Sequence, residues 1–209
     1  MITLLKKALA KIFIKKDIFL PNKHFLVNYC GGKIYLTLEG SMMTKGVIGV
    51  YEYWKTKLFF NLIKEGMTCI DAGAHKGYFS LLFAKLMNDK GKVLSFEPHP
   101  ENCFWFRQST QVNNYKCIKL CPYALSDDEG TTTFYPGKTK GVGSLFYNHN
   151  RSIKQKQLTV KTRKLDNALK EEGITNVDIF KIDVEGAELL VLKGAENILK
   201  KKQKRKNIY

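Results

Sequence analysis

The chain has 209 residues, of which 44% are hydrophobic and 26% are charged, the composition of a folded domain rather than of a disordered chain. Its 35 lysines and arginines exceed its 19 aspartates and glutamates, giving a formal charge of +16. This length suffices for one domain with a core, and no uncharged apolar run approaches the ~18 residues that a transmembrane helix needs. The five cysteines are odd in number and include no C-x-x-C pair, which argues against a disulfide framework or a zinc site. We expect a soluble cytoplasmic protein with reduced thiols.

Lysine supplies most of the positive charge and is spread along the chain. The densest cluster is Lys200–Lys206, where six of seven residues are basic. A surplus of this kind can bind phosphate backbones or anionic lipid head groups. The sequence shows neither an RNA-binding motif with interleaved aromatic residues nor a helix-turn-helix signature. We therefore expect a lysine-rich solvated surface and no specific nucleic-acid partner.

Residues 1–50 are expected to form an N-terminal extension. Met1–Leu20 places apolar residues at helical spacing with lysines between them, which predicts a basic amphipathic helix. Such a helix either makes peripheral contact with a membrane or packs on the domain. Phe25–Tyr29 and Lys33–Leu38 flank Gly31-Gly32, a pair that suits the turn of a β-hairpin because both residues can take positive φ.

Residues 51–199 alternate between strand and helix patterns, and residues 200–209 form a basic tail. Strands are predicted at Met67–Ala72, Lys92–Phe96, Cys117–Ala124 and Asp178–Val184, and helices at Tyr51–Lys64, Tyr78–Asn88, Glu101–Val112 and Ala187–Leu199. A longer segment, Thr131–Arg163, interrupts the alternation and is expected to add strands or a lid. The alternation predicts parallel βαβ units and an α/β, doubly wound, Rossmann-like sheet.

A glycine-containing turn follows the first of these strands, in Ile70–Gly77. Gly73 and Gly77 allow a tight turn and a close approach of the backbone to a ligand. A dinucleotide-binding loop would have glycine at position 75, where this chain has His75. S-adenosylmethionine has no diphosphate and fits the loop better, with Asp71 placed to meet its cationic amino end. An NAD-dependent oxidoreductase shares the fold and is disfavoured by the missing glycine.

Carboxylates follow two further predicted strands. Glu97 ends the second strand some twenty residues after the glycine turn, where a carboxylate can accept hydrogen bonds from ribose hydroxyls. Asp183 and Glu185 flank the end of the fourth strand, which this topology places beside the first. They could steer a cationic sulfonium, hold a substrate hydroxyl or recruit a divalent metal ion, although nothing further in the sequence supports the metal.

Several motifs in this order resemble the FkbM-type S-adenosylmethionine-dependent methyltransferases. They cover about residues 45 to 199 and are Tyr51-Glu52, Gly66 to Ala74 (GMTCIDAGA), Phe96-Glu97-Pro98, Tyr123 to Asp127 (YALSD), Gly143-Ser144-Leu145, Leu165-Asp166, and Lys181 to Gly186 (KIDVEG). The resemblance implies O-methylation of a hydroxyl on a sugar, glycan or related small molecule. It also implies cofactor contacts at the methionine end from Asp71, Gly73, Ala74 and Gly77, at the ribose from Glu97, at the adenine from Ala124 and Leu125, and at the methyl-transfer site from Asp183.

The sequence departs from this family in two places. His75-Lys76 stands where the family often has Asn and an apolar residue. Proteins of this class also continue with three further strands after the fourth unit, so we expect a sheet truncated there, with its C-terminal strands missing. The fourth strand is apolar on both faces and would then need a cover, such as a second copy in a homo-oligomer. The alternative function is an inactive truncated fold that serves as a binding module or is a non-functional fragment.

A hydroxyl acceptor needs a group that takes its proton. Asp183 and Glu185 are the candidates by position, and His75 and His99 are weaker ones on loops at the same end of the sheet. The insert Thr131–Arg163 is expected to shape the acceptor site, because long loops on a rigid scaffold commonly determine specificity.

Overall fold

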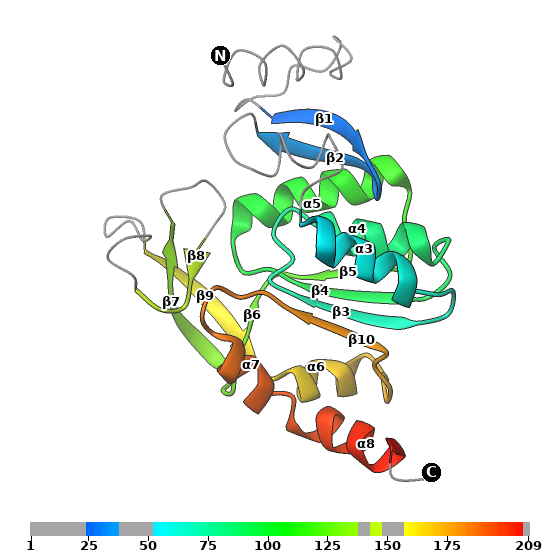
Figure 1. The fold of residues 1–209 in the computed structure, drawn as a ribbon. Coiled ribbons are helices and arrows are strands. Elements are labelled where there is room, and N and C mark those ends of the chain that lie inside the picture. Colours follow the sequence, from blue (N-terminus) through cyan, green and yellow to red (C-terminus); the bar gives the residue numbers. More distant parts are fainter. Residues whose placement is uncertain (1–23, 38–51, 138–142, 148–156, 207–209) are drawn as a thin grey trace.

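The computed structural model describes residues 24–37, 52–137, 143–147 and 157–206 (Figure 1). The predicted helix at Met1–Leu20 lies outside the described residues. None of the helices in the described ranges is long and apolar enough to cross a membrane. All five cysteines are described, and all are free thiols.

The predicted hairpin is confirmed. β1 (His24–Tyr29) pairs antiparallel with β2 (Gly32–Thr37), in a register that matches Tyr29 with Gly32. The hairpin packs on the helices of the central domain. The Tyr29 hydroxyl donates to the backbone oxygen of Tyr78 at 2.9 Å, and the Asn113 side chain bonds both the N–H and the C=O of Lys33 at 2.8 and 2.6 Å. The hairpin is therefore attached to the domain through side chains distant in sequence.

The central sheet contains four parallel strands in the order β10-β3-β4-β5. Their bounds are β3 (Thr68–Ala72), β4 (Lys92–Phe96), β5 (Ile118–Cys121) and β10 (Ile179–Ile182). α4 (Tyr78–Leu86) connects β3 to β4, and α5 (Pro100–Asn113) connects β4 to β5. This is the predicted doubly wound, Rossmann-like arrangement, in which parallel strands are joined by helical crossovers.

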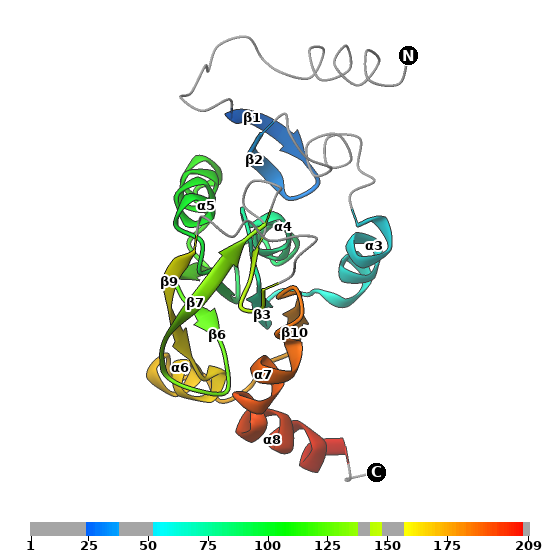
Figure 2. The same ribbon diagram turned by 90° about the vertical axis from the view of Figure 1, so that its left-hand side faces the viewer.

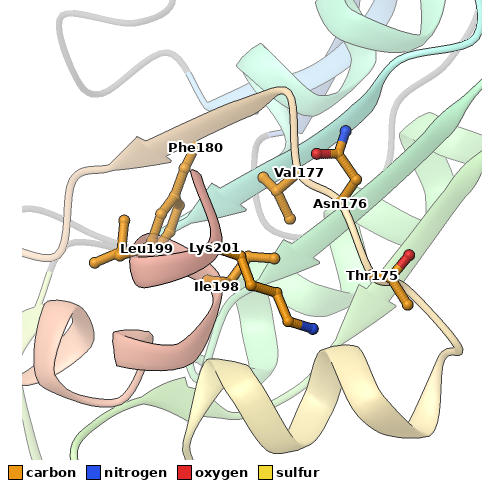
Figure 3. A pocket seen from close by; sticks show the side chains of 7 residues that line it. All are labelled: Thr175, Asn176, Val177, Phe180, Ile198, Leu199 and Lys201. Carbon is orange, nitrogen blue, oxygen red and sulfur yellow. The ribbon is translucent and has the colours of Figure 1, made fainter. Parts of the chain in front are cut away.

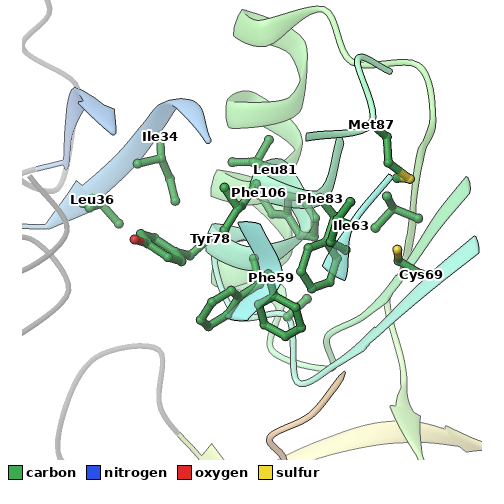
Figure 4. Packing of buried hydrophobic residues seen from close by; sticks show 14 of the residues in the cluster. Ile34, Leu36, Phe59, Ile63, Cys69, Tyr78, Leu81, Phe83, Met87 and Phe106 are labelled. Atoms are coloured by element: carbon green, nitrogen blue, oxygen red, sulfur yellow. The ribbon is translucent and has the colours of Figure 1, made fainter. Parts of the chain in front are cut away.

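Alternate residues of each strand face opposite layers. Cys69 and Val93 belong to a cluster with α3 (Tyr53–Leu62), α4, α5 and the hairpin, which includes the rings of Phe59, Tyr78, Phe83 and Phe106 (Figure 4). Ile70 and Leu94 belong to a second cluster with the helices of the other face, α6 (Leu165–Glu171), α7 (Glu188–Lys193) and α8 (Glu196–Lys206). Both faces of the sheet are thus covered, as the view in Figure 2 also shows.

The insert between β5 and β10 forms a second sheet with the order β6-β9-β7-β8. Its strands are β6 (Ala124–Leu125), β7 (Gly130–Pro136), β8 (Gly143–Ser144) and β9 (Leu158–Arg163). The predicted third strand, Cys117–Ala124, was too long. The chain leaves the central sheet after Cys121, and Ala124 pairs with Thr162 of β9 instead.

The predicted helix Ala187–Leu199 is two helices, because the chain turns at Gly194. A Cβ built on Gly194 would lie 2.0 Å from the backbone oxygen of Ser126, so the turn sits directly against the end of β6. The carbonyl of Gly194 also accepts the N–H of Asp166 at 3.0 Å. Contact with the insert therefore fixes where α7 stops and α8 begins.

β10 is the terminal strand of the central sheet within the described ranges, where it pairs with β3 alone. A small hollow lies between its start and α8 (Figure 3), lined by Thr175, Asn176, Val177, Phe180, Ile198, Leu199 and Lys201. Thr175 to Val177 precede β10, so the hollow lies toward the amino ends of the strands. It is separate from the loops that carry the predicted site, which follow the carboxyl ends.

Candidate active site

The turn after β3 has the backbone conformation that its two glycines permit. Gly73 and Gly77 have φ of 77° and 87°, and the N–H groups of Gly73 and Ala74 both donate to the Phe96 carbonyl at 3.0 Å. A Cβ on Gly73 would lie 2.0 Å from the backbone oxygen of Asp183, and one on Gly77 would lie 2.3 Å from the Phe106 ring. Glycine is therefore required at both positions by close packing within the protein itself.

Asp71 is completely buried beneath this turn. Its Oδ2 accepts a hydrogen bond from the Ser80 hydroxyl at 2.6 Å, and its Oδ1 lies 2.9 Å from the ammonium of Lys181. The Ser95 hydroxyl donates in turn to Ser80 at 2.8 Å. Both carboxylate oxygens are thus bonded inside the protein, where Asp71 connects β3 to α4 through Ser80 and to β10 through Lys181. Its contact with the amino end of a cofactor stays a prediction.

Asp183 borders the turn on the side of β10. It is exposed, with 45% of its side chain accessible. Its Oδ2 lies 3.2 Å from the ammonium of Lys55, and the ammonium of Lys181 is 3.9 Å away. Lys55 also contacts Glu52 at 3.2 Å. Charges of alternating sign therefore run from the interior of the sheet to α3. Lys55 lies three positions after Glu52 and was not among the residues predicted for the site.

Glu97 borders the turn on the opposite side, after β4, and is 5% exposed. Its Oε2 accepts the backbone N–H of His75 at 2.8 Å, and its Oε1 accepts the His99 N–H at 2.8 Å and the Asn102 amide at 3.1 Å. Burial raises the pKa of Glu97 to about 7, against the opposing effect of these donors. A carboxylate offers roughly four acceptor positions, so three protein donors leave about one for a ribose hydroxyl. The predicted ribose contact stays a prediction.

His75 lies between these borders, in the left-handed region at φ 54°. Burial lowers the pKa of its imidazole to about 3, and the nearby Lys76 adds to this shift. Both ring nitrogens are buried and have no hydrogen-bond partner in the part of the chain that the structure describes. Because both ring nitrogens are enclosed, His75 is poorly placed to reach an acceptor hydroxyl, which leaves the exposed carboxylates of Asp183 and Glu185 as the better candidates.

Glu185 is exposed and also has a left-handed backbone, at φ 54°, followed by Gly186 at φ 103°. β10 ends at Ile182, so Asp183 and Glu185 both lie on the irregular loop that follows it, whereas the predicted strand Asp178–Val184 included Asp183. In the described ranges no group of three or more histidine, cysteine, aspartate or glutamate side chains is arranged to hold a metal ion.

Ala124 and Leu125, predicted near the adenine, are buried in β6 with exposed fractions of 7% and 2%. Leu125 packs in the same cluster as Ile70 and Phe96, and Ala124 packs with the insert. Their side chains therefore serve the core, and an adenine contact by their backbone stays a prediction.

Comparison with known proteins identifies the family. The model of the methyltransferase FkbM domain matches residues 71–208, which is more than half of the chain. The chain belongs to the FkbM methyltransferase family. The match contains the glycine turn, Glu97 and the Asp183–Gly186 loop, so the resemblance read from the motifs is confirmed.

Curated relatives of this FkbM-family chain are similar at low identity. The 2-O-methyltransferase NoeI of Sinorhizobium fredii is 27% identical over 154 residues, covering 67% of this chain and 62% of the relative. The hexuronic acid methyltransferase AglP of Haloferax volcanii is 29% identical over 145 residues, covering 68% and 56%. The chain thus spans about three fifths of the length of these relatives. A solved FkbM methyltransferase from Methylobacillus flagellatus aligns over 96% of this chain and 46% of its own, at 13% identity and a TM-score of 0.46.

Proposed function

We propose that this FkbM-family chain transfers a methyl group from S-adenosylmethionine to a hydroxyl oxygen of a sugar, glycan or related small molecule. The observation that carries the proposal is the placement of two carboxylates on either side of one glycine turn. Glu97 bonds the N–H of His75 within the turn, and the carbonyl of Asp183 packs against Gly73. Ligands of parallel α/β sheets bind at this end of the strands.

The residues present fit this cofactor. Glu97 retains about one acceptor position for a ribose hydroxyl, and its fixed orientation suits a directed hydrogen bond. Asp183 and Glu185 supply exposed negative charge at the other border, where the cationic methionine end of the cofactor would lie. His75 stands where a diphosphate-binding loop needs glycine, which favours a cofactor without a diphosphate.

The names of two relatives support the acceptor class. NoeI is a 2-O-methyltransferase and AglP a hexuronic acid methyltransferase. Both names are compatible with an acceptor that carries sugar hydroxyls. Because the chain spans only part of each relative, the acceptor is proposed at the level of this class.

The chain's own residues would perform three tasks in the reaction. S-adenosylmethionine, when bound, supplies a methyl group on a positively charged sulfur. Asp183, paired with Lys55, would orient the acceptor hydroxyl and take its proton, with Glu185 as a second acceptor on the same loop. Glu97 would fix the nucleoside, so that alignment is the main contribution of the protein.

Calorimetric titration with S-adenosylhomocysteine tests the proposal. We expect wild type to bind with a Kd of about micromolar order, and Glu97→Gln and Asp183→Asn to bind about tenfold more weakly or worse, because each loses a charged partner. Glu65→Gln is the matched control, since Glu65 is an exposed carboxylate before β3, at the opposite end of the sheet. Transfer of a labelled methyl group to a glycan panel then tests the acceptor. A folded wild-type protein that binds no S-adenosylhomocysteine would overturn the proposal. Binding without transfer to any acceptor would favour the inactive binding module.

A further inference from the structure

Ser144 joins two segments that are 41 residues apart in sequence. Its hydroxyl donates to the backbone oxygen of Glu185 at 2.7 Å and accepts the backbone N–H of Phe146 at 3.1 Å. One side chain of β8 therefore holds both the loop beyond β10 and the segment that follows β8. The Gly143-Ser144-Leu145 motif is part of the family resemblance, and nothing in the proposed chemistry above uses it.

The loop that Ser144 contacts is strained. Glu185 has φ 54°, and a residue with a Cβ pays a conformational cost in this left-handed region. Such a conformation persists only where surrounding contacts impose it. The hydrogen bond from Ser144 reaches the carbonyl of this strained residue, two positions after Asp183. It is therefore placed to keep the Asp183–Glu185 loop in its observed shape.

The same hairpin of the insert also reaches the other border of the glycine turn. Gly143 packs so tightly on Phe134 that a Cβ would lie 2.4 Å from the ring. The Phe134 ring lies 6.1 Å from that of His99, whose N–H donates to Glu97. β7 and β8 thus connect the Glu97 border to the Asp183 border, and Phe146, half exposed at 50%, lies next to Ser144.

We propose that Ser144 is a positioning residue that couples the cofactor loop to the acceptor side of the site, an inference that rests on the proposed function. When a cofactor orders the Asp183–Glu185 loop, the Ser144 hydroxyl transmits that order to the Phe146 segment. The exposed Phe146 ring then offers a fixed apolar face to an acceptor such as a sugar ring. Binding of the cofactor and order of the insert are therefore linked through one hydroxyl group.

Hydrogen exchange measured by mass spectrometry, with S-adenosylhomocysteine as the probe, tests the coupling. In wild type we expect the probe to slow exchange in peptides covering 183–187 and also in those covering 143–147. Ser144→Ala removes both hydrogen bonds. It should abolish the protection of 143–147 and weaken binding of the probe about three- to tenfold. Ser144→Thr keeps the hydroxyl and should restore both effects. Thr131→Ala, which removes an exposed hydroxyl elsewhere in the insert, is the matched control and should resemble wild type.

The outcomes separate this inference from the proposed function. If wild type does not bind the probe, the proposed function fails. The two Ser144 hydrogen bonds are then tested in the free protein, where Ser144→Ala should still speed exchange at 183–187. If the probe binds and Ser144→Ala changes neither exchange nor affinity, the inference is wrong and the proposed function stands. Equal losses in Ser144→Thr and Ser144→Ala would also overturn it, since a structural defect and not the hydroxyl would then be responsible.

Discussion

The ammonium of Lys181 lies 2.9 Å from Oδ1 of Asp71, with exposed side-chain fractions of 7% and 0%. The two residues are paired in register on the neighbouring strands β10 and β3. A buried ion pair contributes little relative to an apolar pair, but the loss of one partner leaves the other charge without compensation. The buried position of Asp71 in β3 therefore depends on Lys181 in β10, and the reverse.

Lys181→Met should lower the free energy of unfolding by about 3 kcal/mol, because the carboxylate of Asp71 then stays buried without its cation. In the double variant Lys181→Met, Asp71→Asn the loss should be smaller than the sum of the single losses. Urea denaturation followed by circular dichroism measures all of these values. Lys119→Met is the control, since Lys119 pairs with Glu172 at the surface and its replacement should change stability little. Equal losses at the two lysines would contradict the prediction.

Gly73→Ala should destabilise the protein more than Gly173→Ala. Both glycines have positive φ, at 77° and 62°, so both variants carry the strain of a left-handed alanine, about 1 kcal/mol. Only at Gly73 does the new Cβ collide with backbone, at 2.0 Å from the Asp183 oxygen, whereas nothing lies within 4 Å at Gly173. Thermal unfolding should show the difference, and similar melting temperatures would argue against the close approach of these two loops.

Glu97→Gln should remove a pH dependence of stability. The pKa of Glu97 is about 7 in the folded protein, above its ordinary value of 4.5. Between these values the folded state binds more protons than the unfolded state, so wild-type stability falls as pH rises from 4.5 to 7. The variant lacks this contribution, and the difference between the two proteins should change by about 1–3 kcal/mol over that range. Denaturation of both proteins at pH 5 and pH 8 measures this change. An equal change in the free energy of unfolding for wild type and Glu97→Gln would show that the carboxylate is already ionised at pH 5.

The same titration should govern ligand binding. A ribose hydroxyl donates best to an ionised carboxylate, so affinity for S-adenosylhomocysteine should increase as pH rises through about 7 in wild type. Glu97→Gln should bind weakly and with a flat profile across the same range. Calorimetry in buffers of different ionisation enthalpy should also detect proton release in wild type alone. A profile in the variant that follows wild type would assign the titration to another group.

Lys55→Gln should alter charge selectivity while leaving the fold intact. The Lys55–Asp183 pair is about half exposed on both sides, so its loss should cost less than about 1 kcal/mol of stability. Removing the cation beside Asp183 should favour the cationic S-adenosylmethionine over the uncharged sulfur of S-adenosylhomocysteine. The ratio of the two Kd values measures this effect, which should shrink at high salt. An unchanged ratio would place the sulfur away from Lys55.

The periodicity of the sequence predicted the central sheet because its strands are short, apolar and separated by amphipathic helices. Met67–Ala72 and Lys92–Phe96 correspond closely to β3 and β4. The same signal failed where tertiary contacts decide the outcome. The predicted strand Cys117–Ala124 also ran across Pro122, which cannot donate to a strand ladder; Cys121 lies in the central sheet, whereas Ala124 pairs with β9. Likewise, Gly194 interrupts a helical pattern because it packs against Ser126, 68 positions earlier in the chain.

The candidate site was predictable at the level of which loops meet. Strand order alone brings the turn after β3 between Glu97 and Asp183, as expected for carboxyl ends of adjacent parallel strands. The orientation of individual side chains was not predictable. Asp71 turns inward because strand residues alternate between faces, and its partner Lys181 comes from a strand 110 positions later. Lys55 gave no signal of its own, and Ser144 was noted only as part of the Gly143-Ser144-Leu145 motif, since the role of both arises from contacts with the loop beyond β10.

The attachment of the β1–β2 hairpin has a consequence for the order in which the chain folds. The backbone of Lys33 is held by Asn113, 80 positions later, and the N–H of Tyr35 donates to the hydroxyl of Ser109, 74 positions later. During synthesis the hairpin leaves the ribosome well before α5, and the part of its docking surface that holds Lys33 and Tyr35 does not exist until that helix is made. Closing such long loops slows folding. Docking of the hairpin should therefore be a late step, after the βαβ units have assembled, and nascent chains that end before α5 should leave its apolar face accessible to chaperones.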